Sequence, residues 1–406
     1  MTAARERRFS RLPATLLAAA IGATLSLAGC ASMEGVAGSV ASVGGLLPRS
    51  PPGVPSPVLM FVASTRSPGS AAEAGAGDLH YSLDTVTVPP KHEPGVVERP
   101  SFGSADSTRD FVVGGSRPLD DDRFVKEITI HLSGRVGASR DILVFVHGFN
   151  TSLEEARFRL AQIVADSRFG GVPVLFDWQS HGGILAYGSD KESATASRDA
   201  LERLLMELAK TPGLGRVHIL AHSMGGWLAM EALRENAIAG HTDLGGHLGN
   251  VMLAAPDIDL SVFRQQMSRL DGRVRVSVYV SSGDRALSLS SRLAGDRPRL
   301  GALDPSDPRD KAELDRLGVR VHDLSAISDG FIDHGAYADA PEVIRSIGAK
   351  LAEPRADAGV MSTGGEGFQQ LQEAPLTPEA VTASPLAAPT KSSVAAPAAA
   401  RAAVTP

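Results

Sequence analysis

Short runs of apolar residues recur through the middle of the chain, and stretches with helical periodicity separate them. Continuous or alternating apolar runs of this length predict strands. The predicted strands cover residues 58–62, 127–132, 141–146, 172–176, 217–220, 251–256, 274–280 and 319–324, and residues 78–100 are expected to be extended and hairpin-like. Strands that alternate with helices predict the α/β class, a mainly parallel central sheet with helices on both faces.

Helices are predicted where apolar residues follow a period of about 3.6. Residues 152–169 begin with a capping box, because Ser152 is followed by Glu155 three residues later. Leucines at positions 201, 204, 205 and 208 have the spacing of one helix face, so they are expected in the core and not in a ligand site. Two further helices are predicted at residues 227–233 and 341–347.

The strand predicted at residues 217–220 runs directly into Ala221-His222-Ser223-Met224-Gly225-Gly226, and a predicted helix follows. This is the context of a nucleophile elbow, in which a serine is held in a strained backbone conformation and only small neighbours avoid a clash. Gly225 meets that need, and Ala221 adds one methyl group where the pattern usually has glycine. Ser223 is therefore the candidate nucleophile; a chance small-residue turn is the alternative interpretation.

A second loop supports this interpretation, because the strand predicted at residues 141–146 ends in His147-Gly148-Phe149-Asn150. Acyl transfer develops negative charge on a carbonyl oxygen, which requires backbone N–H donors already aimed at that point. One donor is expected from Met224, the residue after the nucleophile, and the other from Phe149, with Asn150 as the second choice. His147 is interpreted as a structural residue that shapes this loop.

The acid and the base that serve a nucleophile elbow follow the serine along the chain, each on a loop after a later strand. Asp284 lies two strands after the elbow and is the preferred acid, while Asp257, one strand after the elbow, is the alternative. His334 lies past the last predicted strand and is the preferred base. The histidines set aside are His322, which lies within a strand, His222, which is expected to point away across the elbow, and His241 and His247, which lie in a Gly-rich loop.

The connection over residues 178–195 is long for a strand–helix link. It is expected to border the acyl pocket or form a small lid, with Trp178, Ile184, Leu185 and Tyr187 as walls, and His147 of the preceding loop is a further candidate pocket residue. The alternative is a surface loop that packs Trp178 on the sheet.

Several strings together carry a family resemblance, and they span roughly residues 60 to 340. They lie at residues 61–66, 146–150, 176–180, 187–190, 221–225, 253–257, 281–287 and 333–335. On them the chain resembles the α/β-hydrolase-fold serine hydrolases, in particular a largely uncharacterised group of bacterial esterase/lipase-like proteins. The resemblance implies a Ser-His-Asp triad that works through an acyl-enzyme, which needs neither a metal nor an organic cofactor.

The N-terminus has a basic start followed by an apolar stretch over residues 12–28, which is typical of a secretory signal. Leu27-Ala28-Gly29-Cys30 closes the stretch and resembles a bacterial lipobox. Cys30, the single cysteine of the chain, is accordingly the predicted lipidation site; a single membrane anchor is the alternative. The resemblance implies an exported bacterial lipoprotein of the cell envelope, in the outer membrane if the organism has one.

The expected organisation is a signal peptide at residues 1–29, a flexible tether at 30–56, one hydrolase domain at 57–353 and a disordered Ala/Pro/Thr-rich tail at 354–406. A net charge of −6 provides no basic face, which argues against nucleic acid as a partner. The leading hypothesis is a lipid-anchored serine hydrolase that cleaves carboxylic esters of small molecules or lipids. An acyltransferase, thioesterase, amidase or peptidase with the same triad stays open, as does a non-catalytic envelope lipoprotein, and the oligomeric state is not predicted.

Overall fold

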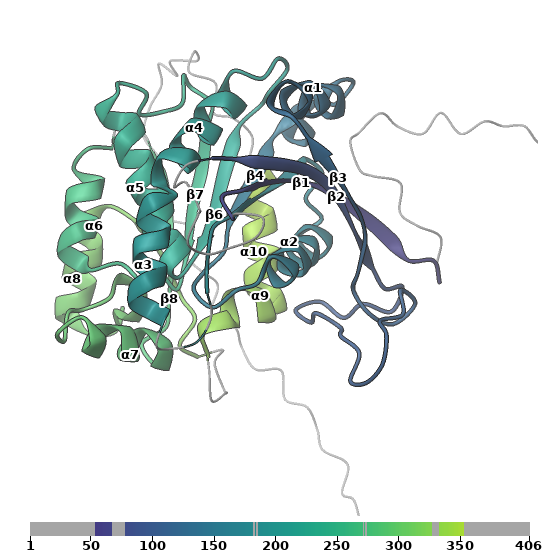
Figure 1. Ribbon diagram of the computed structural model, residues 1–406. Coiled ribbons are helices and arrows are strands. Elements are labelled where there is room, and N and C mark those ends of the chain that lie inside the picture. The colour runs from purple at the N-terminus through teal and green to yellow at the C-terminus, as the bar shows by residue number, and fades with distance from the viewer. Residues whose placement is uncertain are drawn as a thin grey trace, which may run out of the picture. The chain divides into compact units, whose positions relative to one another are not determined.

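Nine strands form one sheet in the order β3-β2-β1-β5-β4-β6-β7-β8-β9 (Figure 1). The computed structural model describes residues 53–66, 78–181, 183, 186–270, 272, 274–326 and 333–352. The strands are β1 (Ser56–Ser64), β2 (His80–Val88), β3 (Val112–Leu119), β4 (Ile142–Val146), β5 (Val172–Asp177), β6 (Val217–His222), β7 (Leu248–Ala254), β8 (Arg275–Val280) and β9 (Arg320–Asp323). β2 is antiparallel to β1 and β3, and the other neighbouring pairs are parallel, which confirms the predicted class.

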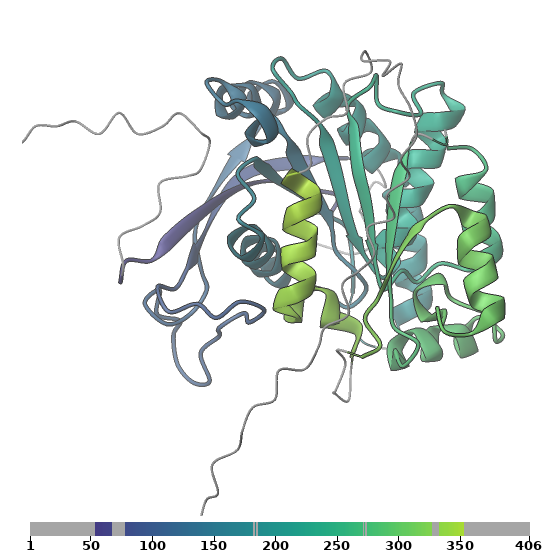
Figure 2. The same ribbon diagram turned by 180° about the vertical axis from the view of Figure 1, so that it is seen from behind.

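Helices cover both faces of the sheet (Figures 1 and 2). The α-helices are α1 (Asp121–Leu132), α2 (Leu153–Ser167), α3 (Tyr187–Ala196), α4 (Arg198–Ala209), α5 (Met224–Ile238), α6 (Leu260–Met267), α7 (Arg285–Leu293), α8 (Pro308–Leu317), α9 (Ala336–Asp339) and α10 (Pro341–Ala352), and the 3-10 helices are η1 (Gly137–Arg140), η3 (Leu300–Ala302) and η4 (Asp333–Gly335). The capping box predicted for α2 is present, with Ser152 and Glu155 bonded to each other's backbone N–H.

The sheet separates two apolar cores, because successive side chains of a strand point to opposite faces. In β4, Val144 joins a core built with α1, α4, α5 and α6. Leu143 and Phe145 join the other core, which is built with α2 and α10. A strand buried on both faces is apolar at every position, which explains the continuous run of residues 142–146.

Residues 127–132, predicted as a strand, form the second half of α1, so that prediction was wrong. Asp120 caps the helix by accepting a hydrogen bond from the Arg123 N–H. Phe124, Ile128 and Leu132, spaced by four residues, are buried, whereas Ile130 is 55% exposed. Apolar residues at 128, 130 and 132 alternate with polar ones, which is the pattern of a strand. The helical spacing of four residues becomes visible only when Phe124 is included.

The edge strand β3 was not predicted, because Gly114, Gly115 and Pro118 all disfavour a strand interior. No helix in the described ranges combines the length and apolar character that crossing a membrane requires. The predicted signal segment, Cys30, the pocket candidates Ile184 and Leu185 and the C-terminal tail lie outside the described residues.

We expect Ile128→Ala to lower the free energy of unfolding by about 2–5 kcal/mol, because it opens a cavity under α1. Ile130→Ala, the matched control, is expected to change it by no more than about 0.5 kcal/mol, because that side chain is exposed. Urea denaturation followed by circular dichroism measures both values. Equal losses would indicate that the two side chains share one buried face, as they would in a strand.

Candidate active site

Ser223 occupies the sharp turn between β6 and α5. Its backbone has φ 53° and ψ −121°, a conformation that L-residues adopt only when the surrounding structure imposes it. The Ser223 N–H donates to the Ala254 carbonyl (2.9 Å), which ties the turn to β7. A Cβ at Gly225 would lie 2.3 Å from the His147 carbonyl oxygen, so glycine is required there.

The preferred acid and base lie together although fifty positions separate them. Asp284 follows β8, is fully buried and accepts a hydrogen bond from the Leu287 N–H at the start of α7 (3.0 Å). His334 lies in η4 with its side chain partly exposed, and its Nδ1 donates to Asp284 Oδ2 (2.7 Å). This contact fixes the carboxylate on one ring nitrogen and leaves Nε2 for another partner.

Asp257, the alternative acid, has a different set of contacts. Its Oδ2 accepts the Tyr187 hydroxyl (2.8 Å), and its Oδ1 accepts the Ser290 hydroxyl (2.6 Å) and lies 3.2 Å from Arg299 Nε. No histidine bonds Asp257 among the described residues. Asp257 is therefore bonded to Tyr187, Ser290 and Arg299, whereas Asp284 lies beside the candidate base.

Ser223 and His334 line the same cavity, whose volume is about 310 Å³. Apolar side chains form most of its wall: Phe149, Ala286, Leu287, Leu289 and Leu293. Tyr187, Asp257 and Ser290 add a polar patch to it. Tyr187 was predicted as a pocket residue, and here it combines an aromatic wall with a hydroxyl that holds Asp257.

The two predicted N–H donors lie on the loops that flank Ser223. Met224 is the first residue of α5, and the first N–H groups of a helix have no partner within the helix. Asn150, the second choice for the other donor, uses its N–H to bond Ser180 Oγ (2.8 Å). The geometry therefore favours Phe149 over Asn150.

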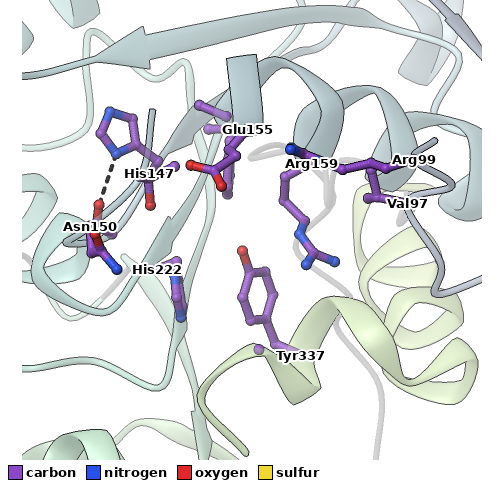
Figure 3. A pocket seen from close by; sticks show the side chains of 13 residues that line it. Val97, Arg99, His147, Asn150, Glu155, Arg159, His222 and Tyr337 are labelled. Carbon is purple, nitrogen blue, oxygen red and sulfur yellow. Dashed lines mark hydrogen bonds between the residues drawn. The ribbon is translucent and has the colours of Figure 1, made fainter. Parts of the chain in front are cut away.

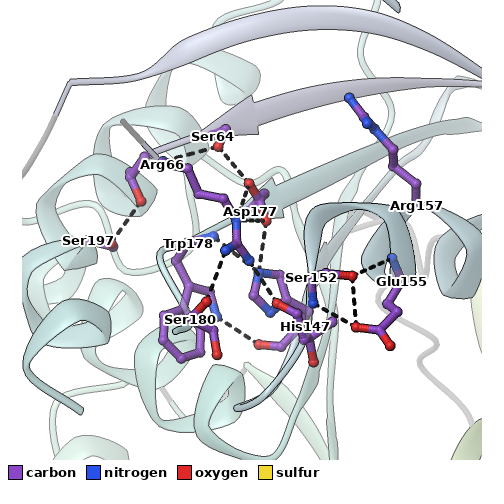
Figure 4. Close-up of polar contacts among 12 residues, drawn as sticks. Ser64, Arg66, His147, Ser152, Glu155, Arg157, Asp177, Trp178, Ser180 and Ser197 are labelled. Carbon is purple, nitrogen blue, oxygen red and sulfur yellow. Dashed lines mark hydrogen bonds and ion pairs between the residues drawn. The ribbon is translucent and has the colours of Figure 1, made fainter. Parts of the chain in front are cut away.

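A buried carboxylate, Asp177, holds the loop that carries Phe149 (Figure 4). It accepts hydrogen bonds from the Ser64 hydroxyl (2.6 Å) and from Arg66 Nε (2.8 Å). His147 Nε2 lies 3.1 Å from Asp177, and its Nδ1–H donates to the Gly148 carbonyl (2.9 Å). Burial alone would raise the pKa of Asp177, but these contacts lower it below its ordinary value.

Trp178 does not border the cavity that holds Ser223, contrary to one of the two interpretations left open. It is fully buried, its ring stacks on His147 with 5.2 Å between centroids, and its Nε1–H donates to the His147 carbonyl (2.8 Å). The alternative, in which Trp178 packs on the sheet, describes its position. A side chain without exposure braces the loop and cannot contact a substrate.

His222 has a role that sequence reasoning missed. Its Nε2–H donates to the backbone carbonyl of His334 (2.8 Å), and its ring stacks on Tyr337 with 4.7 Å between centroids. Burial, together with the nearby His334, holds the pKa of His222 well below its usual range, so the ring is neutral. The side chain points away from the Ser223 cavity, as expected, and yet it fixes the loop of the candidate base.

Two other histidines that were set aside have partners outside this arrangement. His322 in β9 stacks on Tyr279 with 4.6 Å between centroids, and burial lowers its pKa to about 4. His247 Nδ1–H donates to the Gly215 carbonyl (2.8 Å). Within the described ranges, no cluster of three His, Cys, Asp or Glu side chains that could hold a metal ion occurs.

Comparison with known families gives the fold a name. The model of a family described as "Alpha/beta hydrolase of unknown function (DUF900)" matches residues 122–353. The chain belongs to this family of α/β hydrolases. No curated protein matches the hydrolase.

Solved structures similar to the hydrolase include esterases of low sequence identity. Brefeldin A esterase, a bacterial homologue of human hormone-sensitive lipase, is 13% identical with a TM-score of 0.38, over 76% of this chain and 81% of that chain. An esterase from the archaeon Pyrobaculum calidifontis is 16% identical with a TM-score of 0.33, over 54% of this chain and 78% of that chain. The assignment of the hydrolase rests on the family match and the strand order, and these similarities concern the fold alone.

We expect Asp177→Asn to lower the free energy of unfolding of the hydrolase by about 3–5 kcal/mol near neutral pH, because Arg66 loses its buried partner. A lowered pKa in the folded state gives stability that is present above the unfolded value of 3.8 and is lost as the pH falls through the folded value. The difference in the free energy of unfolding between wild type and Asp177→Asn should therefore shrink below about pH 3.8.

Urea denaturation at a series of pH values measures this difference. Ser64→Ala is the matched control, because it removes one hydrogen bond from Asp177 and no charge, so its cost of about 1 kcal/mol should depend little on pH. A difference for Asp177→Asn that stays constant down to the acid transition would contradict a charged Asp177.

Proposed function

We propose that this hydrolase is a serine esterase that cleaves carboxylic esters with Ser223 as nucleophile, His334 as base and Asp284 as the acid of the triad. The observation that carries the proposal is the 2.7 Å hydrogen bond between His334 and Asp284, on the wall of a cavity that Ser223 also lines. The strained backbone at Ser223 supports it, because strain of this kind concentrates at functional residues.

In the proposed reaction, His334 Nε2 takes the hydroxyl proton of Ser223 while Oγ attacks the ester carbonyl carbon. The N–H groups of Met224 and Phe149 stabilise the oxyanion of the tetrahedral intermediate. His334 then gives the proton to the leaving alcohol, and an acyl-enzyme remains. A water molecule deprotonated by His334 attacks the acyl carbon, which releases the carboxylic acid and restores Ser223.

The cavity favours esters with short, apolar acyl groups. A volume of about 310 Å³ lies at the lower end of the usual range for ligand sites, about 300–1,000 Å³. Leu287, Leu289 and Leu293 supply apolar contact, and the Tyr187–Asp257–Ser290 network limits how far an apolar chain can extend before it meets polar groups.

We propose in addition that Cys30 carries a lipid that anchors the esterase to a membrane of the cell envelope. The support is the sequence alone, the basic start, the apolar stretch and Leu27-Ala28-Gly29-Cys30. Partition of wild type and Cys30→Ala between membrane and soluble fractions tests it, and equal partition would contradict it.

We expect a fluorophosphonate probe to label the protein at Ser223 and p-nitrophenyl esters to be cleaved fastest when the acyl chain is short. Ser223→Ala should abolish labelling and lower kcat by on the order of 10⁶-fold, because the nucleophile is removed. Circular dichroism controls for folding. A well-folded wild type that neither reacts with the probe nor cleaves any ester would overturn the proposed function and favour a non-catalytic lipoprotein.

Asp284→Asn is expected to lower kcat by about 10⁴-fold, because asparagine favours the wrong tautomer of His334. Asp257→Asn is the matched control, and we expect it to change kcat by less than about tenfold, because Asp257 bonds the cavity wall and not the base. Steady-state kinetics on one short ester measures both. The reverse order of the two effects would reassign the acid to Asp257.

A further inference from the structure

A second cavity, of about 440 Å³, is lined by His147 and Asn150 of the loop that follows β4 (Figure 3). It shares Asn150 with the cavity of Ser223, and it is lined by Gly335, the residue next to His334. His222 forms part of its wall as well. The second cavity therefore borders the proposed catalytic centre, although the proposed reaction leaves it without a role.

We propose that this second cavity binds an anionic group of the substrate, a carboxylate or a phosphate, so that the preferred esters carry a negative charge. This inference rests on the proposed esterase function and names its substrate class. Arg99, Arg159 and the Tyr337 hydroxyl would hold the anion.

Two guanidinium groups provide the charge. Arg159 Nη1 donates to Asp339 Oδ1 (2.8 Å) and Gln162 Oε1 (3.1 Å), which fixes the side chain at the cavity wall and leaves its other N–H groups for a ligand. Arg99 lies over the Phe158 ring at 5.0 Å, and its charge helps to lower the pKa of Glu155 in the same cavity. Arginine suits carboxylate and phosphate because its planar fork matches both geometries.

Tyr337 supplies an independent observation. The residue is only 3% exposed, and its hydroxyl, which forms no hydrogen bond within the described part of the chain, is the accessible end of the side chain. Figure 3 shows this hydroxyl directed into the second cavity, between Glu155 and Arg159. Because the hydroxyl is accessible from the cavity, a ligand atom that accepts a hydrogen bond can reach it there.

The acidic group in the lining of this cavity is already engaged by other donors. Glu155 is the acidic residue of the lining, and its carboxylate is already held by the N–H and the hydroxyl of Ser152, both at 2.8 Å. His222 is neutral, and His147 lies against Asp177. Arg99 and Arg159 are balanced in charge by Glu155 and by Asp339, the ion-pair partner of Arg159, so the attraction for an anion comes from the guanidinium N–H groups that these carboxylates leave unbonded at the cavity.

The test compares two butyrate esters of similar shape with a single scissile ester each, the anionic 4-carboxyphenyl butyrate and the neutral amide 4-carbamoylphenyl butyrate, and each rate is referred to the rate of spontaneous hydrolysis of the same ester. We expect wild type to prefer the anionic ester, and the ratio of the two kcat/KM values to fall by about tenfold in Arg99→Gln and in Tyr337→Phe. Arg123→Gln, an exposed arginine at the start of α1, is the matched control and should leave the ratio unchanged. A wild type without preference, or a ratio that no variant alters, would overturn the inference.

A binding measurement separates this inference from the proposed function. Calorimetric titration of the full-length Ser223→Ala protein with inorganic phosphate and with glutarate needs no turnover and distinguishes the two anions. Saturable binding that is weakened about tenfold by Arg99→Gln or Tyr337→Phe would support the site, even if fluorophosphonate labelling had shown that the serine is not activated. Absence of binding for both anions at millimolar concentration would overturn it.

Discussion

The buried carboxylate of Asp177 is the constraint on which the rest of the site depends. β1, β5 and β4 are adjacent parallel strands, so their carboxyl ends bring Ser64, Asp177 and His147 to the same edge of the sheet. Arg66 offsets the buried charge and uses its remaining N–H groups to bond the carbonyls of Thr151 (2.8 Å) and Ser180 (3.1 Å). Since buried charges are stable only when they are paired and hydrogen-bonded, this network holds the loop of Phe149 in one position. A loop that is fixed in this way keeps its backbone N–H groups aimed at one point. Such preorganised donors stabilise developing charge effectively because they need not reorganise during the reaction.

The turn that carries Ser223 packs closely against the backbone of the loop at residues 147–150. A side chain at Gly225 would collide with the His147 carbonyl oxygen, and one at Gly148 would lie 2.8 Å from His222 Nδ1 and 3.1 Å from Ser223 Cβ. Glycine at both positions therefore allows the candidate nucleophile and the candidate N–H donors to approach closely. The strained φ and ψ of Ser223 persist because these contacts, together with the Ala254 and Asp257 backbone bonds, leave the turn no relaxed alternative.

The parts of the fold and the site that could be predicted from the sequence are those whose signals are local. The buried strands, the capping box of α2 and the turn at Ser223 each occupy a few consecutive residues with one physical explanation. Helix α1 was misread because three alternating apolar residues satisfy both periods, and only packing decides that Ile130 faces solvent. The bond from His222 to His334 could not be predicted, because it joins positions more than a hundred residues apart and uses a backbone carbonyl that has no sequence signature. Asp257 and Asp284 both follow strands of the sheet; the count of strands after Ser223 favoured Asp284, and only the position of η4 shows that His334 lies beside it.

His222 and Tyr337 connect the two cavities physically. The His222 ring packs against both the His334 ring and the Tyr337 ring, each at 4.7 Å between centroids, and Tyr337 and His222 line the second cavity. A ligand group held there would press on the same stack that positions the candidate base. Binding energy from a remote part of a substrate contributes to rate only when it improves the geometry at the reacting atoms, and in the proposed site this stack would transmit that effect. An ester that fills one cavity and not the other would therefore lose kcat as well as affinity, which distinguishes an orienting contact from one that only holds the substrate.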